Sequence, residues 1–282
     1  MPAAMATARV HEALESATDA LAAAGVDTPR LDAELLLADA SGWDRARLVA
    51  EADADVSAST ARRFGEMVRR RVRREPVAYI LGRKGFRRIE VRVDRRALIP
   101  RPETELLVEL ALEREARRVL DLGTGSGAIA LAVADELPGC EVVATDTSAA
   151  AVDLARENAE RLGFGGRVRV ERGSVPDGAR FDVVLANLPY VREDELFGLP
   201  PEISRYEPRE AVIAGPEGLE AIAAVAPAAA AALEPDGLLA LEVGVGQAGA
   251  VAELLLDLGF GEIGARQDLA GIPRVVLGVG PP

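Results

Sequence analysis

The sequence has 282 residues, which is enough for one large domain or two unequal ones. Its 46 acidic and 33 basic residues leave a net charge of −13, which argues against a protein that holds nucleic acid mainly through phosphates, unless a local basic run intervenes. With one cysteine and one histidine, the chain has neither an internal disulfide nor a cysteine-rich or histidine-cluster metal site, so no metal is expected.

Apolar residues at helical spacing predict a small bundle of helices over residues 1–75. The first helix ends near Gly25 and turns inward Val10, Leu14, Ala17 and Leu21. Thr28 is expected to cap a second helix that begins at Pro29. The apolar face of this second helix is Leu31, Leu35 and Ala38. A short helix follows at 44–51, and a fourth helix starts near Ser57 or Ser59 with Phe64, Met67, Val68 and Val72 inward.

The fourth helix ends in the arginine-rich run 69–74 (RRRVRR). One interpretation is a solvated helix end, where cations suit the negative pole of the helix dipole. The other is a docking patch for an acidic or RNA-containing partner. We favour the first.

Residues 76–103 are expected to form a linking β-hairpin, since Ile89, Val91 and Val93 alternate with charged residues downstream of two glycines. From 104 to 282, apolar strands alternate with helices, which predicts an α/β fold with a mostly parallel sheet covered on both faces. Strands are expected at 119–122, 141–145, 168–171, 181–186, 238–243 and 274–279. Helices are expected at 128–136, 149–162, 217–234 and 251–258.

A glycine-rich turn, residues 121–127 (DLGTGSG), directly follows the first of these strands. Glycines let a ligand lie close against backbone N–H groups, at the strand ends where α/β sheets bind ligands. The spacing lacks both the dinucleotide fingerprint and the Lys-Ser/Thr pair of a phosphate loop. We expect Asp121 to lie under the loop, with its carboxylate facing the cationic methionine part of a cofactor directly or through water. The cofactor-binding residues predicted here are Asp121, Gly123, Thr124, Gly125, Ser126 and Gly127.

Asp146 ends the second strand, where a carboxylate can accept hydrogen bonds from both hydroxyls of a ribose. The same charge would repel a 2′-phosphate, so NADP is not expected. The alternative is a helix cap, because Asp146 precedes a predicted helix. We favour ribose binding.

The tetrapeptide Asn187-Leu188-Pro189-Tyr190 (NLPY) follows the fourth strand. Amide and exocyclic amino nitrogens are poor nucleophiles, so a site must hold the NH₂ group in line with the methyl group of a sulfonium. The Asn187 side-chain oxygen can accept one N–H, and the carbonyl of Leu188, extended because Pro189 follows, can accept the other. Tyr190 offers a flat apolar face. These residues predict an S-adenosylmethionine-dependent methyltransferase acting on a glutamine amide or an adenine amine, which present the same NH₂ geometry.

With these motifs, the chain resembles the PrmC/HemK family, which methylates the glutamine of the Gly-Gly-Gln motif in peptide-chain release factors. Similar segments are RLDAELLL (30–37), EPVAYILG (75–82), LIPRPETE (98–105), LPPEISRYEPR (199–209), GPEGL (215–219) and LEVG (241–244). The resemblance implies a Rossmann-like class I methyltransferase domain at 104–282, a β-hairpin linker at 76–103 and a smaller N-terminal helical bundle at 1–75 that docks the substrate.

The resemblance also implies roles for individual residues. The cofactor would contact Gly123, Thr124, Gly125, Gly127, Asp146 and Asn187. The substrate glutamine would meet Asn187, Leu188, Pro189 and Tyr190, which we take as the catalytic residues. Arg101 and Glu103 are candidates for the wall of the cofactor pocket, with a structural ion pair as the alternative.

Two positions depart from the family pattern. Leu188 stands where the family usually has proline, and NLPY resembles the tetrapeptide of ribosomal RNA adenine dimethyltransferases. Ser174 stands where the family often has an acidic residue. The main hypothesis is methylation of the release-factor glutamine at its side-chain amide nitrogen, and the alternatives are adenine-N6 methylation of RNA or DNA and a cofactor-binding module without catalysis.

The expected partner is a release factor, with no membrane and no direct requirement for nucleic acid; ribosome contact is left open and a monomer is expected. No apolar run approaches the roughly 20 residues of a membrane span, and the N-terminal residues lack the apolar core of a secretion signal. A single cysteine fits a reducing compartment, so we expect a cytoplasmic protein.

Overall fold

The computed structural model describes residues 8–281; residues 1–7, the start of the N-terminal stretch in which no secretion signal is expected, lie outside it. Contacts divide the chain into two compact units. The helical unit contains the chain up to Gly82 together with Pro201–Tyr206, and the sheet unit contains Arg83–Pro200 and the chain from Glu207 onward. The sequence predicted that residues 201–206 belong to the methyltransferase domain at 104–282. The grouping of these residues with the N-terminal helices differs from that prediction.

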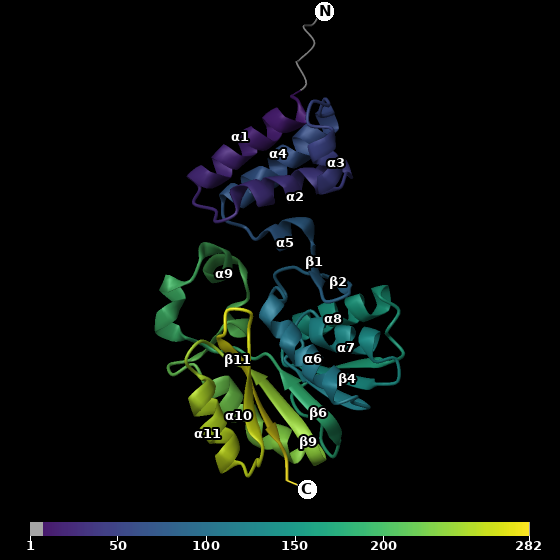
Figure 1. Cartoon of the computed structure of the whole chain (residues 1–282), viewed down its shortest axis with the longest axis vertical. Helices are drawn as coiled ribbons and strands as arrows, with labels where there is room; N and C mark the ends of the chain where they lie inside the picture. The colour runs from purple at the N-terminus through teal and green to yellow at the C-terminus, as the bar shows by residue number, and fades with distance from the viewer. Residues whose placement is uncertain (1–7, 282) are drawn as a thin grey trace, which may run out of the picture. The chain divides into compact units, whose positions relative to one another are not determined.

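The N-terminal helices of the helical unit pack around one apolar core, to which Pro201–Tyr206 contributes no residue; Figure 1 shows their arrangement. The helices of this unit are α1 (Val10–Ala23), α2 (Pro29–Ser41), α3 (Arg45–Ala50), α4 (Ala58–Val72), α5 (Val77–Leu81) and α9 (Pro201–Tyr206). The inward face predicted for α1 is confirmed, since its buried residues are Val10, Leu14, Ala17 and Leu21. Ser57 caps α4 by accepting a hydrogen bond from the backbone N–H of Thr60, as the predicted start near this serine implies.

The inward face predicted for α2 is wrong. Its buried residues are Asp32, Ala33, Leu36 and Leu37, whereas Leu31 is 39% exposed. Thr28 precedes the helix but its hydroxyl oxygen accepts no hydrogen bond from the helix N-terminus, so the predicted cap is absent; the hydroxyl donates to Asp32. Val72 on α4 is likewise 39% exposed, and the neighbouring Arg71 is buried in its place. Burial of an aspartate and an arginine, rather than of the apolar residues beside them, has one cause.

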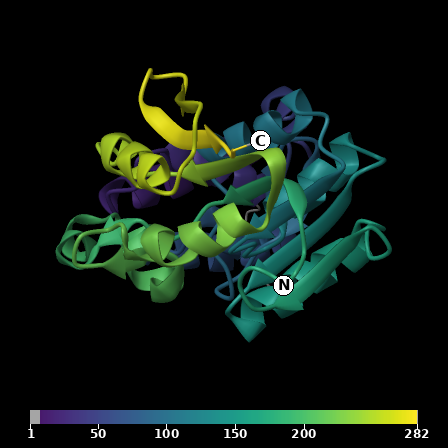
Figure 2. The same cartoon turned by 90° about the horizontal axis from the view of Figure 1, so that it is seen from below.

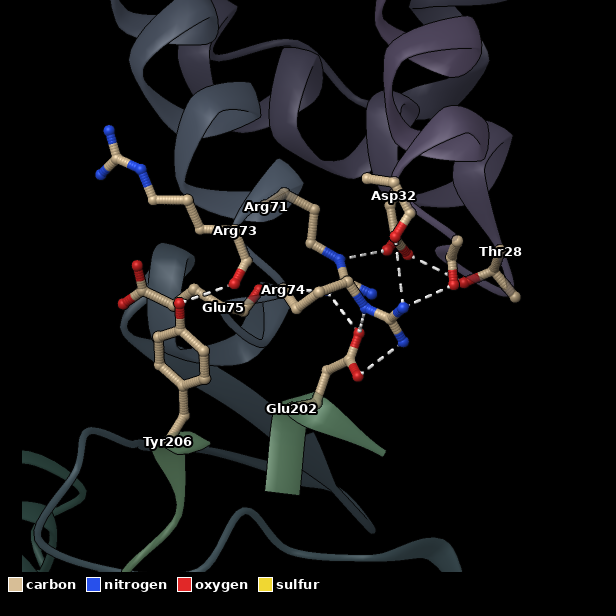
Figure 3. A network of polar contacts seen from close by, with 10 residues as sticks. Thr28, Asp32, Arg71, Arg73, Arg74, Glu75, Glu202 and Tyr206 are labelled. Atoms are coloured by element: carbon tan, nitrogen blue, oxygen red, sulfur yellow. Dashed lines mark hydrogen bonds and ion pairs between the residues drawn. The ribbon is translucent and has the colours of Figure 1, made fainter. Parts of the chain in front are cut away.

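That cause is an ion-pair network inside the helical unit (Figure 3). Arg71 donates from Nε to Asp32 at 2.7 Å and from Nη1 to Glu202 of α9 at 2.7 Å. Arg74 donates to both carboxylate oxygens of Glu202, at 2.7 and 2.8 Å, and to the carbonyl of Gly25 at 2.7 Å. Burial opposes ionisation of Glu202, but the hydrogen bonds from Arg74 and Arg71 prevail and lower its pKa. These charges are paired and hydrogen-bonded, which is what burial requires of them.

The arginine run 69–74 is therefore largely a structural element. Arg70 forms a bidentate pair with Glu75, at 2.7 and 2.8 Å, and Arg71 and Arg74 hold Glu202. The side chains of Arg69 and Arg73 are exposed, and the Arg73 carbonyl accepts a hydrogen bond from Tyr206 at 2.8 Å (Figure 3). Three of the five arginines of the run thus form ion pairs within the helical unit. The solvated helix end that we favoured is therefore wrong for these three, and their pairing also argues against a docking patch.

Within residues 83–200 and 207–281, seven strands form one sheet in the order β10-β11-β9-β6-β3-β4-β5. They are β3 (Arg118–Leu122), β4 (Glu141–Asp146), β5 (Val168–Arg172), β6 (Phe181–Ala186), β9 (Leu233–Glu242), β10 (Ile263–Gln267) and β11 (Pro273–Val279). All neighbours from β5 to β9 are parallel, while β11 is antiparallel to both β9 and β10. The predicted mostly parallel α/β sheet is confirmed.

Helices cover both faces of the sheet, with α10 and α11 on one side and α6, α7 and α8 on the other (Figure 1). They are α6 (Glu105–Glu113), α7 (Ala128–Glu136), α8 (Ala149–Arg161), α10 (Glu220–Ala231) and α11 (Ala248–Asp257). Figure 2 shows α10 and α11, in green and yellow, side by side on their face. No helix in the described part of the chain is long and apolar enough to cross a membrane.

Smaller elements complete the sheet unit. The predicted hairpin is present as β1 (Arg83–Phe86) and β2 (Ile89–Arg92), and a second pair joins β7 (Val191–Arg192) to β8 (Ile213–Gly215). Single 3₁₀ turns are η1 (Pro102–Thr104), η2 (Glu193–Gly198) and η3 (Arg209–Ala211). The buried Asn158 donates to the carbonyls of Arg92 and Ser126 and accepts from the N–H of Arg92, which ties the hairpin to the glycine-rich turn.

Several elements differ from the sequence-based expectation. The strand β10 was missed, because its five residues are partly or fully exposed and carry no apolar alternation. The expected helix 217–234 is shorter, since its end contributes to the long strand β9. The helices α5, α6 and α9 and the β7–β8 pair were not predicted, and α5 lies inside residues 76–103, which were expected to form the hairpin linker.

Candidate active site

A cavity of about 330 Å³ lies in the sheet unit where β3, β4, β5 and β6 end. This is the edge at which parallel α/β sheets bind ligands. Eight of the residues singled out from the sequence line it: Gly123, Thr124, Gly125, Ser126, Asp146, Asn187, Leu188 and Pro189. The three predicted sites therefore meet in one pocket. Asp121, Gly127 and Tyr190 do not line it.

The glycine-rich turn lies close against its surroundings. Gly123, Gly125 and Gly127 have φ values of 72°, 56° and 84°, in the left-handed region that favours glycine. A Cβ on Gly123 would come within 2.9 Å of the Leu188 side chain, so the turn and the NLPY tetrapeptide pack directly together. The N–H groups of Gly123 and Thr124 both donate to the Thr145 carbonyl at 2.9 Å, which anchors the turn to β4.

Asp121 lies beneath the turn, as expected, and is fully buried. One carboxylate oxygen, Oδ2, accepts from the Thr124 hydroxyl at 2.6 Å and from the Ala130 N–H at 3.1 Å. The other oxygen, Oδ1, is buried without a hydrogen-bond partner. Burial raises the pKa of Asp121 to about 7, and the nearby charge of Asp146 adds to the rise. An unpartnered buried carboxylate oxygen is the kind of group that a cationic ligand or a water would satisfy.

Asp146 is held by the backbone on both sides. Its Oδ2 accepts from the Gly125 N–H at 3.0 Å and its Oδ1 from the Ser148 N–H at 2.9 Å. The helix cap itself is Ser148, whose hydroxyl accepts from the N–H of Ala151 at the start of α8. The alternative role of Asp146 as the cap is therefore wrong. Each carboxylate oxygen keeps a lone pair that can accept from a ribose hydroxyl.

Three residues of the tetrapeptide line the pocket and the fourth does not. Asn187, Leu188 and Pro189 line the cavity, and the Asn187 side chain donates from Nδ2 to the Thr104 hydroxyl at 3.0 Å. The Tyr190 hydroxyl lies 3.5 Å from Glu242, a long hydrogen bond, and burial raises the pKa of this tyrosine to about 12. Its carbonyl accepts from Gln247 at 2.8 Å. Tyr190 is thus held by Glu242 and Gln247 and does not contribute to the wall of this cavity.

The segment RPETE contributes to the pocket through residues other than those expected. Thr104 lines the cavity, together with Pro100 just upstream, whereas Arg101 pairs with the buried Glu207 at 2.5 Å. The alternative of a structural ion pair is therefore correct for Arg101. Glu103 does not line the cavity.

No role was predicted from the sequence for Thr104, Glu242 or Glu210. Glu242, at the end of β9, is 2% exposed and accepts from the Thr104 hydroxyl at 2.6 Å. Burial raises the pKa of Glu242 to about 7. The one feature of the sequence that could have indicated these residues is that Thr104 lies in the family-like segment RPETE and Glu242 in the family-like segment LEVG. Ser174 and Glu210 also line the cavity.

Comparisons with known proteins match both parts of the chain. The model of the PrmC N-terminal domain matches residues 12–82, and that of the methyltransferase small domain matches residues 102–197. The release factor glutamine methyltransferase of Caulobacter vibrioides is 40% identical over 280 residues, covering 97% of each chain. Those of Moorella thermoacetica and Xylella fastidiosa are 42% and 43% identical, over 95% and 92% of this chain and 97% and 96% of theirs. The chain belongs to the release factor glutamine methyltransferase family.

Solved structures agree on the fold of this family member. A methyltransferase from Pyrococcus furiosus aligns with a TM-score of 0.52 and 19% identity, over 68% of this chain and 89% of its own. The catalytic domain of hMettl16 aligns with a TM-score of 0.53 and 17% identity, over 68% and 77% of the two chains. At such identities the likeness concerns the fold alone, and it confirms the predicted class I methyltransferase fold.

Proposed function

We propose that this protein transfers a methyl group from S-adenosylmethionine to the side-chain amide nitrogen of the glutamine in the Gly-Gly-Gln motif of peptide-chain release factors. The observation that carries the proposal is identity of about 40% over nearly the full length with several release factor glutamine methyltransferases. The pocket gives this assignment a physical basis. Asn187, whose side-chain oxygen can accept a hydrogen bond from a substrate amide, lines the same cavity as the glycine-rich turn.

The residues of the pocket suit S-adenosylmethionine, whose sulfonium supplies an electrophilic methyl group. The turn from Gly123 to Ser126 allows close approach of the cofactor to the backbone. Asp146, fixed by two backbone N–H groups, has lone pairs for the ribose hydroxyls. Asp121 is fully buried beneath the turn and does not line the cavity, so its unpartnered Oδ1 would favour the positive charge of the methionine part through water rather than by direct contact.

Asn187 and Leu188 would hold the acceptor. Two carbonyl oxygens, the side-chain oxygen of Asn187 and the backbone oxygen of Leu188, can accept the two hydrogens of the glutamine NH₂ group. This fixes the plane of the amide and aims the nitrogen at the methyl group, so that the reacting atoms are already in line before the transfer. The new N–CH₃ bond replaces the S–CH₃ bond, and the nitrogen then loses a proton. No histidine is required.

The partner under this proposal is the release factor, docked by the N-terminal helical domain that the sequence predicts at residues 1–75. We also infer that the protein acts as a monomer in the cytoplasm, where translation termination takes place, and that it needs no direct contact with nucleic acid. The division of labour between the units rests on the family resemblance of residues 12–82 to the PrmC N-terminal domain.

Adenine-N6 methylation of RNA or DNA, the alternative, drew on NLPY and on the arginine run. Three arginines of the run are ion-paired within the helical unit, and the net charge of −13 opposes phosphate binding. Of the two features that suggested adenine methylation, only the NLPY tetrapeptide still supports it.

The test is mass spectrometry of a release factor after incubation with the protein and S-adenosylmethionine. We expect a mass gain of one methyl group on the Gly-Gly-Gln peptide, located on the glutamine by fragmentation. A release factor in which that glutamine is replaced by glutamate serves as the control and should gain none. Absence of the gain on the unmodified release factor would refute the proposal.

A further inference from the structure

Three buried or half-buried polar groups form a line that ends at the proposed acceptor site. Glu242 accepts from the Thr104 hydroxyl at 2.6 Å, and the Thr104 oxygen accepts from Nδ2 of Asn187 at 3.0 Å. Glu242 and Thr104 are 2% and 3% exposed. The strands explain the meeting: β6 and β9 are parallel with Ala186 opposite Leu241, so the residues that follow, Asn187 and Glu242, lie at the same edge of the sheet.

The direction of each hydrogen bond follows from the chemistry of the first group. An ionised carboxylate has no hydrogen to donate, so the single hydrogen of the Thr104 hydroxyl must point to Glu242. The Thr104 oxygen can then only accept, and its neighbour must be the NH₂ end of the Asn187 amide. A turned amide would place Oδ1 of Asn187 against an oxygen with no hydrogen to share. The carboxylate thereby determines which way the amide two bonds away is turned.

We propose that Glu242 is a positioning residue that acts through Thr104 to keep the oxygen of the Asn187 amide, and not its NH₂ group, available to the substrate. The inference rests on the proposed glutamine methylation, in which Oδ1 of Asn187 accepts an N–H. In the described part of the chain, Oδ1 accepts no hydrogen bond from protein, while Nδ2 is engaged by Thr104. An amide turned the other way would present a donor to the donor group of the substrate and would not hold it.

The groups around Glu242 set its pKa, and this pKa sets the pH range in which the carboxylate determines the orientation of the Asn187 amide. Burial raises its pKa to about 7, the neighbouring charge of Glu103 adds to the rise, and the hydrogen bonds from Thr104 and Tyr190 and the charge of Arg274 oppose it. Below this value Glu242 is protonated and can itself donate to Thr104. The Thr104 hydroxyl is then free to donate to Oδ1 of a turned Asn187, so the control over the amide weakens as the pH falls.

The experiment compares Thr104→Val, Thr104→Ser and Glu242→Gln with the unaltered full-length protein, using a release factor as substrate. Valine keeps the shape of threonine without the hydroxyl, serine keeps the hydroxyl, and glutamine keeps the shape of glutamate but can donate. Groups that orient a binding side chain typically account for about 10- to 100-fold, so we expect kcat to fall by about that factor in Thr104→Val and Glu242→Gln. Thr104→Ser should restore most of the rate lost in the valine variant.

Other readouts separate this role from a loss of structure. KM for the release factor and binding of S-adenosylhomocysteine, measured by calorimetry, should change little, because neither depends mainly on the Asn187 amide. The rise of kcat with pH near 7 should be flattened in Glu242→Gln. Asp182→Asn is the matched carboxylate-to-amide control, since Asp182 lies near the start of β6, away from the pocket, and its Oδ2 accepts from the N–H groups of Arg117 and Arg118 at 2.8 Å. Its kcat should equal that of the unaltered protein.

The outcomes are distinct from those of the proposed function. If the unaltered protein methylates the release factor and both Thr104→Val and Glu242→Gln retain its kcat, the positioning role is refuted. The same conclusion follows if Thr104→Ser is as slow as Thr104→Val, or if the kcat of both variants falls only in step with lost cofactor binding. If the unaltered protein methylates no release factor, the proposed function itself fails.

Discussion

Replacing Glu242 by glutamine should make this protein more stable above neutral pH, although the same change slows it. The Glu242 carboxyl is almost completely buried, and burial raises its pKa from the ordinary 4.5 to about 7. Because one pKa unit is about 1.4 kcal/mol, the fold favours the protonated form by about 3 kcal/mol. The stability contributed by this proton is complete below pH 4.5 and is lost as the pH rises through 7. Glutamine cannot ionise, so it avoids the loss.

The advantage of Glu242→Gln over the unaltered protein should therefore grow with pH. From pH 5.5 to 8.5 the difference in the free energy of unfolding should increase by about 2 kcal/mol, as linkage of protonation to folding requires. Urea unfolding followed by circular dichroism at the two pH values measures it. Asp121, whose pKa is also raised to about 7, is present in both proteins, so its titration cancels in the comparison. A variant less stable than the unaltered protein at pH 8.5 would show that the charged form of Glu242 is well accommodated, against our reasoning.

Other substitutions test the remaining parts of the account. Asn187→Ala should lower kcat by about 100-fold or more with an unchanged melting temperature, since one preorganised hydrogen-bonding group is lost; near-normal turnover would mean that NLPY is not the acceptor site. Leu188→Pro should still methylate glutamine, because the carbonyl remains, and loss of activity with intact cofactor binding would contradict this. Asp146→Ala should weaken S-adenosylhomocysteine binding in calorimetry, and equal affinity would remove the ribose assignment. Glu202→Ala should destabilise the helical unit by about 3 kcal/mol, because it leaves the buried Arg71 without one of its two carboxylate partners. Unfolding followed by the fluorescence of Trp43 measures the loss, with Glu195→Ala, a change at an exposed glutamate, as the control. If Glu202→Ala costs no more than Glu195→Ala, the structural role of Glu202 is refuted.

How well the sequence predicted each part depends on how local its cause is. The α1 face was predictable because one apolar stripe faces one core. The α2 face was not, since the burial of Asp32 depends on Arg71, which lies 39 residues away in the sequence and is held in turn by Glu202. No periodicity within α2 encodes such a partner.

The candidate site follows the same rule. The glycine-rich turn, Asp146 and Asn187 each directly follow a strand, so position along the chain was enough to place them at one edge of a parallel sheet. Thr104 and Glu242 are 138 residues apart and meet because α6, which directly follows Thr104, packs against β9, which ends at Glu242. Tyr190 was predicted to face the substrate because aromatic side chains suit planar ligands. Its hydroxyl lies 3.5 Å from Glu242 and it does not line the cavity, so its contact with a substrate stays a prediction.

The most direct test of the central claim is a single reaction that contains the protein, S-adenosylmethionine with a labelled methyl group, a release factor and an equal mass of ribosomal RNA. The account predicts label on the release factor, located at the glutamine of its Gly-Gly-Gln motif, and none on the RNA. Label on the RNA with an unlabelled release factor would contradict the assignment to glutamine and favour adenine as the acceptor.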